Sequence, residues 1–270
     1  MYAPLFRAGR FDDPSTVEWS KFGLADMSCP LHRQIQYEAA LQSFVLLKNA
    51  PPPSALSSAT PVLPLKVGTK IAVVGPQAIA REGLLEDYAA DQQCFGGTYD
   101  CITTIAEAIT AANVGGHTVV AKGVDVNSGD SSGIAAAVAA AAAADVIVLV
   151  LGNDRTQEHE TLDRTDTALP GLQEPFAMQI FALGRPVVMV LTNGGALAID
   201  NLMSQPDAIV EAFNPGVAGA VPLAHSLFGT QNRWGKLPIT MWAMLRVFSP
   251  RVALSERCAG TPMITSSSRI

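Results

Sequence analysis

The chain has 270 residues, of which 49% are hydrophobic and 16% are charged. This composition excludes intrinsic disorder, because disordered chains are polar and rich in charge, and the length allows one large domain or a domain with an extension. The 24 acidic residues outnumber the 18 basic ones, which gives a net charge of −6. Because Lys and Arg form no cluster that would neutralise a run of phosphates, nucleic acid is not an expected partner.

The first part of the chain, residues 1–64, is expected to be a connection between domains. Leu31–Leu47 carries apolar residues near helical spacing, which predicts a helix. Ala50–Pro64 combines prolines and serines with no charge, a composition typical of a linker. Residues 1–64 therefore read as an inter-domain connection with a helix and a Pro-rich linker.

Residues 65–242 alternate between short apolar runs and helical stretches. The expected strands are Lys70–Gly75, His117–Gly123, Asp145–Gly152, Pro186–Gly194 and Ala208–Phe213. The expected helices are Ile105–Asn113, Gly133–Ala144, Gly171–Leu183 and Pro222–Phe228. Because continuous apolar runs are typical of buried parallel strands, this alternation predicts βαβ units. The expected fold class is α/β, a layered α/β sandwich with a mostly parallel sheet.

One window, Gly133–Gly152, is apolar over almost 20 residues, but Asp145 falls within it, and a charge inside a bilayer costs roughly 2.5–3.5 kcal/mol. A helix followed by a buried strand is the better interpretation, and no membrane partner is expected. The start of the chain lacks the apolar stretch of a secretory signal. Residues 243–270 show no regular period and end in serines, so they are expected to form a divergent, poorly ordered tail.

Four scattered cysteines argue against a disulfide scaffold, and the absence of a CxxC pair argues against a structural metal. Cys94 and Cys101 flank a Gly-containing loop. They would close a small disulfide in an oxidising compartment, or remain free as many buried cysteines do. Neither alternative is favoured by the sequence.

The polar segment Gly152–Gln173 is the candidate active-site loop, because it leaves the carboxyl end of a central strand, where α/β sheets bind ligands. Glu158 and Glu160 are two acids one residue apart, and Asp163 with Arg164 can tether the loop by a charge-assisted pair. A glutamate against an apolar wall would have a raised pKa and act as a general acid. The alternative is an acidic loop that only faces solvent.

Other sites find less support in the sequence. His159 lies among the carboxylates, but no second His follows at helical spacing, so no metal is expected. No Gly-rich phosphate loop and no nucleophile elbow occurs, so neither a nucleotide nor any other cofactor is expected. The three tryptophans are isolated and are expected to be packing residues rather than a sugar platform, although an exposed one could stack on a pyranose face.

Six segments, taken in order, resemble glycoside hydrolase family 3. They are Gln42–Asn49 (QSFVLLKN), Lys70–Pro76 (KIAVVGP), Leu84–Tyr88 (LLEDY), Gln157–Glu174 (QEHETLDRTDTALPGLQE), Val190–Asp200 (VLTNGGALAID) and Glu211–Thr240 (EAFNPGVAGAVPLAHSLFGTQNRWGKLPIT). Ordered agreement over this span is more specific than any single motif.

The resemblance implies an exo-acting β-xylosidase or β-glucosidase with an N-terminal (β/α)8 barrel and a C-terminal α/β sandwich. It places this chain on the sandwich, with Phe6–Trp19 similar to the connection that leaves the barrel and with the barrel itself absent. Members of the family carry the acid/base in an E-G-x-D-R loop. The match implies Glu160 as the general acid/base and Glu158 as the alternative, with Asp163 and Arg164 in support. Thr161 replaces the usual glycine.

The resemblance also implies what the chain lacks. A retaining glycosidase needs two carboxyl groups about 5–5.5 Å apart, and the family's nucleophile lies on the barrel. This chain is therefore expected to be inactive alone, with a barrel domain and a β-linked oligosaccharide or aryl glycoside as partners. The paired glutamates favour xylosides slightly, secretion is implied for the full-length family member, and residues 241–270 lack the family's usual continuation, which indicates a truncated or frame-shifted end.

Two other hypotheses remain. A non-catalytic module derived from this fold would bind a sugar or a partner. A flavodoxin-like nucleotide binder would rest on the fold class alone, and it would need the phosphate-loop glycines that this sequence lacks.

Overall fold

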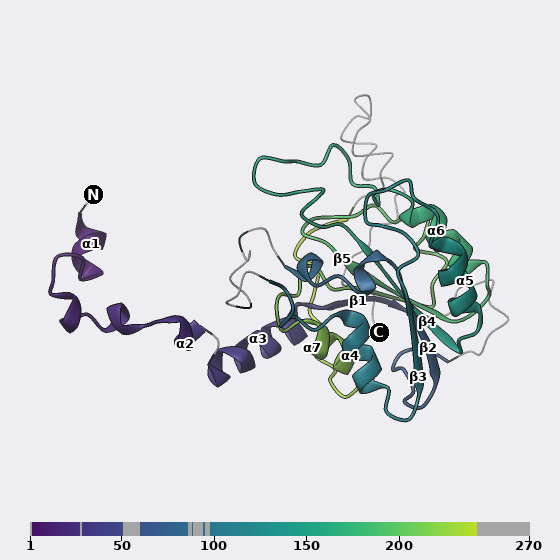
Figure 1. The fold of residues 1–270 in the computed structure, drawn as a ribbon, viewed down its shortest axis with the longest axis horizontal. Helices are drawn as coiled ribbons and strands as arrows, with labels where there is room; N and C mark the ends of the chain where they lie inside the picture. Colours follow the sequence, from purple (N-terminus) through teal and green to yellow (C-terminus); the bar gives the residue numbers. More distant parts are fainter. Residues whose placement is uncertain are drawn as a thin grey trace.

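The computed structural model describes residues 2–27, 29–50, 60–85, 88, 94 and 98–241. The expectations for most of the Pro-rich linker, for part of the LLEDY segment, for Trp242 and for the tail fall outside the described residues. The described residues form a layered body, from which an N-terminal arm, residues 2–27, projects on one side (Figure 1).

The arm contains little buried surface. Its elements are α1 (Ala3–Arg7), two 3-10 turns (Pro14–Thr16 and Glu18–Lys21) and α2 (Leu24–Met27). Trp19 is 60% exposed and Val17 is the one buried residue described in the arm. The next helix, α3 (Pro30–Ser43), joins the body by its C-terminal end, where Leu41 is buried and the Tyr37 hydroxyl lies 2.7 Å from His225 Nδ1.

The centre of the body is one six-stranded sheet. Its strands are β1 (Val45–Asn49), β2 (Lys70–Val74), β3 (His117–Ala121), β4 (Val146–Gly152), β5 (Val187–Thr192) and β6 (Ala208–Glu211). The spatial order is β1-β6-β5-β4-β2-β3. All neighbours are parallel except β1, which runs antiparallel to β6 at one edge. The expected sandwich with a mostly parallel sheet is confirmed.

Helices cover both faces of the sheet. They are α4 (Ile105–Ala112), α5 (Ile134–Ala142), α6 (Gln173–Phe181) and α7 (Ala220–Leu227). The pair α4 and α7 packs on one face and the pair α5 and α6 on the other (Figure 1). Every residue of β4 and β5 is buried, which explains why these strands read as continuous apolar runs in the sequence. Apolar burial on two faces is the main stabilising contribution to the fold.

The five expected strands and four expected helices are present, with ends that differ from the expectation by no more than two residues. The apolar window Gly133–Gly152 divides into α5 and β4, and among the described residues no helix has the length and apolar character needed to cross a membrane. One predicted helix was wrong at its C-terminal end. The helix predicted over Leu31–Leu47 ends at Ser43, because Phe44 is extended (ψ 140°) and the next residues pair with β6 as β1.

Candidate active site

The central parallel strands end side by side at the carboxyl edge of the sheet. Gly152 closes β4 opposite Thr192, the last residue of β5, and Glu211 closes β6 next to them. A β-carbon on Gly152 would overlap with the Thr192 carbonyl oxygen, so only glycine allows this close approach. The loops that follow the three strands therefore start from one fixed edge, which is where open α/β sheets bind ligands.

The candidate loop is closed at its base by Gln173, the first residue of α6. The Gln173 Oε1 accepts from the Gly152 N–H at 2.9 Å, and its Nε2 donates to the Gly152 carbonyl at 2.7 Å. The same Nε2 also donates to the Val126 carbonyl at 2.9 Å. Because this amide is fully buried, its bonds are shielded from water and hold the two ends of the loop together.

Glu160 lies at the tip of a short hairpin within this loop. The backbone of His159 and Leu162 pairs in both directions, at 2.9 and 3.1 Å, and leaves Glu160 and Thr161 as the two turn residues. Thr161 has φ +78°, whereas Glu160 does not have positive φ. This pattern is that of a type II turn, which favours glycine at the third position. The loop thus adopts the conformation that a glycine would favour, although a β-branched residue is strained there.

Glu158 is held at the base of this hairpin. Its Oε2 accepts from Arg164 Nε at 2.6 Å and its Oε1 accepts from Asn153 Nδ2 at 3.0 Å. Arg164 also donates to the Ala196 carbonyl after β5, at 3.2 Å. The predicted tether between Asp163 and Arg164 was wrong in its acidic partner: Arg164 pairs with Glu158, because the guanidinium points inward across the hairpin whereas Asp163 is exposed.

The hairpin borders a cavity of about 320 Å³ at the carboxyl edge. All three acids of the loop that the sequence singled out, Glu158, Glu160 and Asp163, line it. Its other lining residues are Leu85, Tyr88, Asn153, Asp154, Arg155, His159, Leu162, Gly194, Gly195 and Asn214. Arg164 lines a second hollow, of about 440 Å³, which shares Leu162 and Asp163 with the first. The structure therefore brings the predicted acids together around one hollow.

Arg155, which lines the cavity, is held by a carboxylate that the sequence pattern does not reveal. Arg155 Nη1 and the Tyr99 hydroxyl both donate to Glu82 Oε1, at 3.0 and 3.1 Å. Burial, and then the Glu82 carboxylate beside it, raise the pKa of Tyr99. These contacts join the candidate loop to the segment that precedes α4.

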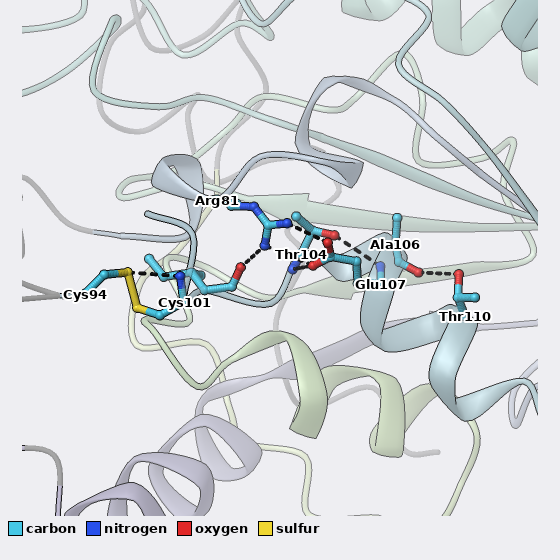
Figure 2. A network of polar contacts seen from close by, with 8 residues as sticks. Arg81, Cys94, Cys101, Thr104, Ala106, Glu107 and Thr110 are labelled. Carbon is cyan, nitrogen blue, oxygen red and sulfur yellow. Dashed lines mark hydrogen bonds and ion pairs between the residues drawn. A yellow bond between two sulfur atoms is a disulfide. The ribbon is translucent and has the colours of Figure 1, made fainter. Parts of the chain in front are cut away.

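The disulfide between Cys94 and Cys101, one of the two alternatives left by the sequence, is present at the end of that segment. Figure 2 shows how it adjoins the start of α4: Arg81 contacts the Ile102 carbonyl and the Glu107 carboxylate, and Glu107 closes a capping box with Thr104. Helix capping and the disulfide together fix the beginning of α4 beside this segment.

One buried acid beneath the cavity was also missed. Glu211 is 0% exposed, and burial raises its pKa to about 8, against the opposing effects of the Phe213 N–H and the Asn193 amide. The signal in the sequence is a carboxylate within the apolar run Ala208–Phe213, a run that predicts only a strand.

His159 is exposed at the hairpin, and its Nδ1 lies 2.5 Å from the Glu160 carbonyl oxygen. Within the described ranges, no group of three or more His, Cys, Asp or Glu residues is placed to hold a metal ion. The chemistry that the arrangement offers is that of a carboxyl group carried on a fixed turn beside a polar cavity. Such a group can donate or accept a proton when a substrate lies against the edge of the sheet.

Comparison with known proteins identifies the family. The model of the glycosyl hydrolase family 3 C-terminal domain matches residues 44–256. The chain is 33% identical over 258 residues to beta-D-xylosidase 1 of Arabidopsis thaliana, covering 94% of this chain and 31% of that protein. It is 33% identical over 230 residues to a periplasmic beta-glucosidase of Salmonella typhimurium, covering 78% of this chain and 28% of that protein.

Solved structures agree in fold. A GH3 exo-beta-xylosidase in complex with a xylobiose aziridine probe superposes with a TM-score of 0.75 at 28% identity, covering 90% of this chain and 29% of that one. A beta-glucosidase from Listeria innocua in complex with isofagomine superposes with a TM-score of 0.73 at 27% identity, covering 89% of this chain and 31% of that one. The chain thus spans about 30% of the length of these relatives, and it belongs to glycosyl hydrolase family 3, matching the C-terminal domain of that family.

Proposed function

We propose that this chain is the acid/base-bearing domain of an exo-acting retaining β-glycosidase, which hydrolyses terminal β-D-xylosyl or β-D-glucosyl residues. The observation that carries the proposal is the position of Glu160, at the tip of a paired hairpin beside the cavity at the carboxyl edge. The named relatives are xylosidases and glucosidases, which supports this class of substrate.

In the proposed mechanism, Glu160 protonates the oxygen of the leaving group and then, as a carboxylate, activates the water that completes hydrolysis. Glu158 is less suited to this role, because Arg164 and Asn153 already bind both of its oxygens. We assign it instead to holding the hairpin. The nucleophile, a second carboxyl group about 5–5.5 Å from the first, is supplied by a barrel domain. The chain alone is then inactive.

A hybrid enzyme tests the proposal. In it, this chain replaces the corresponding region of the Arabidopsis xylosidase, and hydrolysis of aryl β-D-xylosides and β-D-glucosides is measured. We expect Glu160→Gln to lower kcat/KM by about 10²–10⁴ for a poor phenol leaving group. The loss should be much smaller for 2,4-dinitrophenol, which departs without protonation.

Two variants in the same loop serve as controls. Asp166→Asn, which removes an exposed acid of the loop, should keep full activity, and Glu158→Gln should lower the rates for all leaving groups to a similar extent. Full activity of Glu160→Gln on both substrates would contradict the assignment. Turnover by the isolated chain that depends on Glu160 would contradict its inactivity.

A further inference from the structure

Glu211 occupies a position from which it contacts two of the loops around the cavity. Its Oε1 accepts from the Phe213 N–H at 2.9 Å, at the start of the loop that brings Asn214 to the cavity. Its other neighbour is the side-chain amide of Asn193, in the loop that brings Gly194 and Gly195 there. One carboxyl group thus joins the loops after β5 and β6.

The contacts continue from Asn193 to the hairpin. Asn193 Nδ2 donates to the Gly195 carbonyl at 2.7 Å, and Arg164 donates to the neighbouring Ala196 carbonyl. A β-carbon on Gly195 would lie 2.8 Å from Arg164 Nη2, so the guanidinium packs directly on this backbone. Since Arg164 binds Glu158, an unbroken series of contacts leads from Glu211 to the base of the hairpin that carries Glu160.

The surroundings of Glu211 favour its neutral form. The carboxyl group is fully buried, and its register partners are the apolar Val45 on β1 and Leu191 on β5. The Phe213 N–H and the Asn193 amide favour the ionised form, but they are uncharged and burial outweighs them. Within the described part of the chain, Glu211 Oε2 and Asn193 Oδ1 are buried acceptors without a hydrogen-bond partner. Protonation would make the Glu211 carboxyl group a hydrogen-bond donor in a region where the buried Asn193 Oδ1 lacks one among the described residues, whereas an ionised carboxylate would leave a buried charge without a cationic partner.

The backbone next to Glu211 is strained in a way that this contact explains. Phe213 has φ +52°, and Phe213 and Thr161 are the two non-glycine residues with positive φ among those described. Each is next in sequence to a residue that lines the cavity, Thr161 to Glu160 and Phe213 to Asn214. Strained conformations persist where the surroundings over-determine them, and the Glu211 hydrogen bond to the Phe213 N–H is such a constraint.

We propose that Glu211 is a positioning residue that acts as a neutral hydrogen-bonding acid and holds the loops after β5 and β6, and through Asn193 and Arg164 the hairpin of Glu160, in their places around the cavity. This inference rests on the proposed function for its purpose, since it assigns Glu211 to the support of the acid/base. It assigns no direct contact between Glu211 and a substrate.

The test is an NMR titration of the full 270-residue chain between pH 5.5 and 9.5, observed at the backbone amides of Gly194, Gly195 and Asn214 and at the Arg164 Nε–Hε group. We expect all four signals of the wild-type protein to shift together, with one midpoint near 8. Glu211→Gln, which is neutral at every pH, should keep the signals at their low-pH positions and abolish the titration. Glu211→Leu should displace them at every pH and speed exchange of the Arg164 Hε by at least tenfold.

Asp207→Asn is the matched control, because it neutralises another buried carboxyl group, at the opposite edge of the sheet, and should leave the titration unchanged. Signals that do not titrate together in the wild type, or a Glu211→Gln protein that resembles Glu211→Leu, would overturn the proposal. If Glu211→Leu does not fold, the wild type and Glu211→Gln still decide.

The titration uses no substrate, so its outcome is separate from that of the hybrid-enzyme assay. If the four signals titrate together as expected but Glu160→Gln leaves the hybrid enzyme fully active, the proposed function is wrong and the positioning role of Glu211 stands. If the signals do not titrate together but the hybrid enzyme is active and depends on Glu160, only the role of Glu211 is wrong.

Discussion

The two edges of the sheet differ in how completely their buried polar side chains are hydrogen-bonded, although Gln173 at the carboxyl edge uses its whole amide. At the amino edge, Asn113 uses its whole amide: it accepts from the Gly68 N–H and donates to the Thr69 carbonyl and the Thr118 hydroxyl, at 3.0–3.2 Å. Asp207 likewise accepts from the Val187 N–H at 2.8 Å. At the carboxyl edge, by contrast, buried oxygens of Glu211 and Asn193 have no partner among the described residues.

Backbone strain divides in the same way. Thr161 and Phe213, the non-glycine residues with positive φ in the described ranges, both belong to loops that leave the carboxyl edge. A satisfied edge contributes to folding, whereas unsatisfied groups and strain lower stability and persist mainly where a site needs them. The comparison therefore indicates that the amino edge serves the fold and the carboxyl edge serves the site.

The largest expected effect is the pH dependence that Glu211 gives to stability. Its pKa is about 8 in the folded chain against 4.5 as the reference value, so between these values the folded state keeps a proton that the unfolded state has lost. The free energy of unfolding contributed by Glu211 is complete below pH 4.5 and is lost as the pH rises to 8, by an amount on the order of a few kcal/mol. Urea unfolding of the wild type and of Glu211→Gln at pH 5, 6.5 and 8 measures it. If the free energy of unfolding changes with pH equally in both proteins, Glu211 does not cause the pH dependence.

The next largest effect is expected at the amino edge of the sheet, where Asn113 has its hydrogen-bond partners. Asn113→Ala removes the buried amide that binds the Gly68 N–H and the Thr69 carbonyl in partly buried hydrogen bonds, and it should lower the free energy of unfolding by about 1–2 kcal/mol at every pH. The signals of the cavity amides should stay in place. Urea unfolding measures the loss, with the exposed Asn232→Ala as the control. A loss below about 0.5 kcal/mol would mean that the amino edge contributes less to folding than its contacts imply.

A smaller effect is expected at the base of the hairpin. The Arg164 and Glu158 side chains are 16% and 29% exposed, so Glu158→Gln should weaken the ion pair by about 1 kcal/mol rather than by the full cost of a buried charge. Hydrogen exchange at the His159 and Leu162 amides should then become about fivefold faster, while exchange in β4 is unchanged. Faster exchange in β4 as well would show that the hairpin and the sheet open together.

The smallest expected effect concerns the backbone strain at Thr161. Thr161→Gly removes a left-handed strain of roughly 1–2 kcal/mol and adds a backbone entropy cost of roughly 0.5–1 kcal/mol, so we expect a net gain of up to about 1.5 kcal/mol. Thr165→Gly, in the same loop but without positive φ, should lose stability instead. Thermal unfolding of the two variants gives the sign, and a loss in both would show that Thr161 carries no strain.

The sequence predicted the sheet well because its strands are apolar on both faces. The runs in β2, β4 and β5 need no partner to be recognised, and the loop after β4 is identified by its charges alone. The strand β1 was missed for the opposite reason: Val45–Leu47 continues the apolar residues of α3, and only its pairing with β6 makes it extended. A pattern of neighbouring residues in the sequence cannot reveal a pairing strand such as β6, which lies more than 160 residues from Val45.

The candidate site was predicted in part for a related reason. Composition and spacing identify Glu158, Glu160, Asp163 and Arg164 as one polar loop, since all four lie within a few residues. They do not show that Arg164 binds Glu158 rather than Asp163, that Glu160 lies at the turn, or that Glu211 lies beneath the cavity. The sequence determined by itself the fold class and the loop, whose signals are local. Only the tertiary structure decided which carboxyl group is paired, exposed or buried, because burial and ion pairing depend on residues brought together from separate strands.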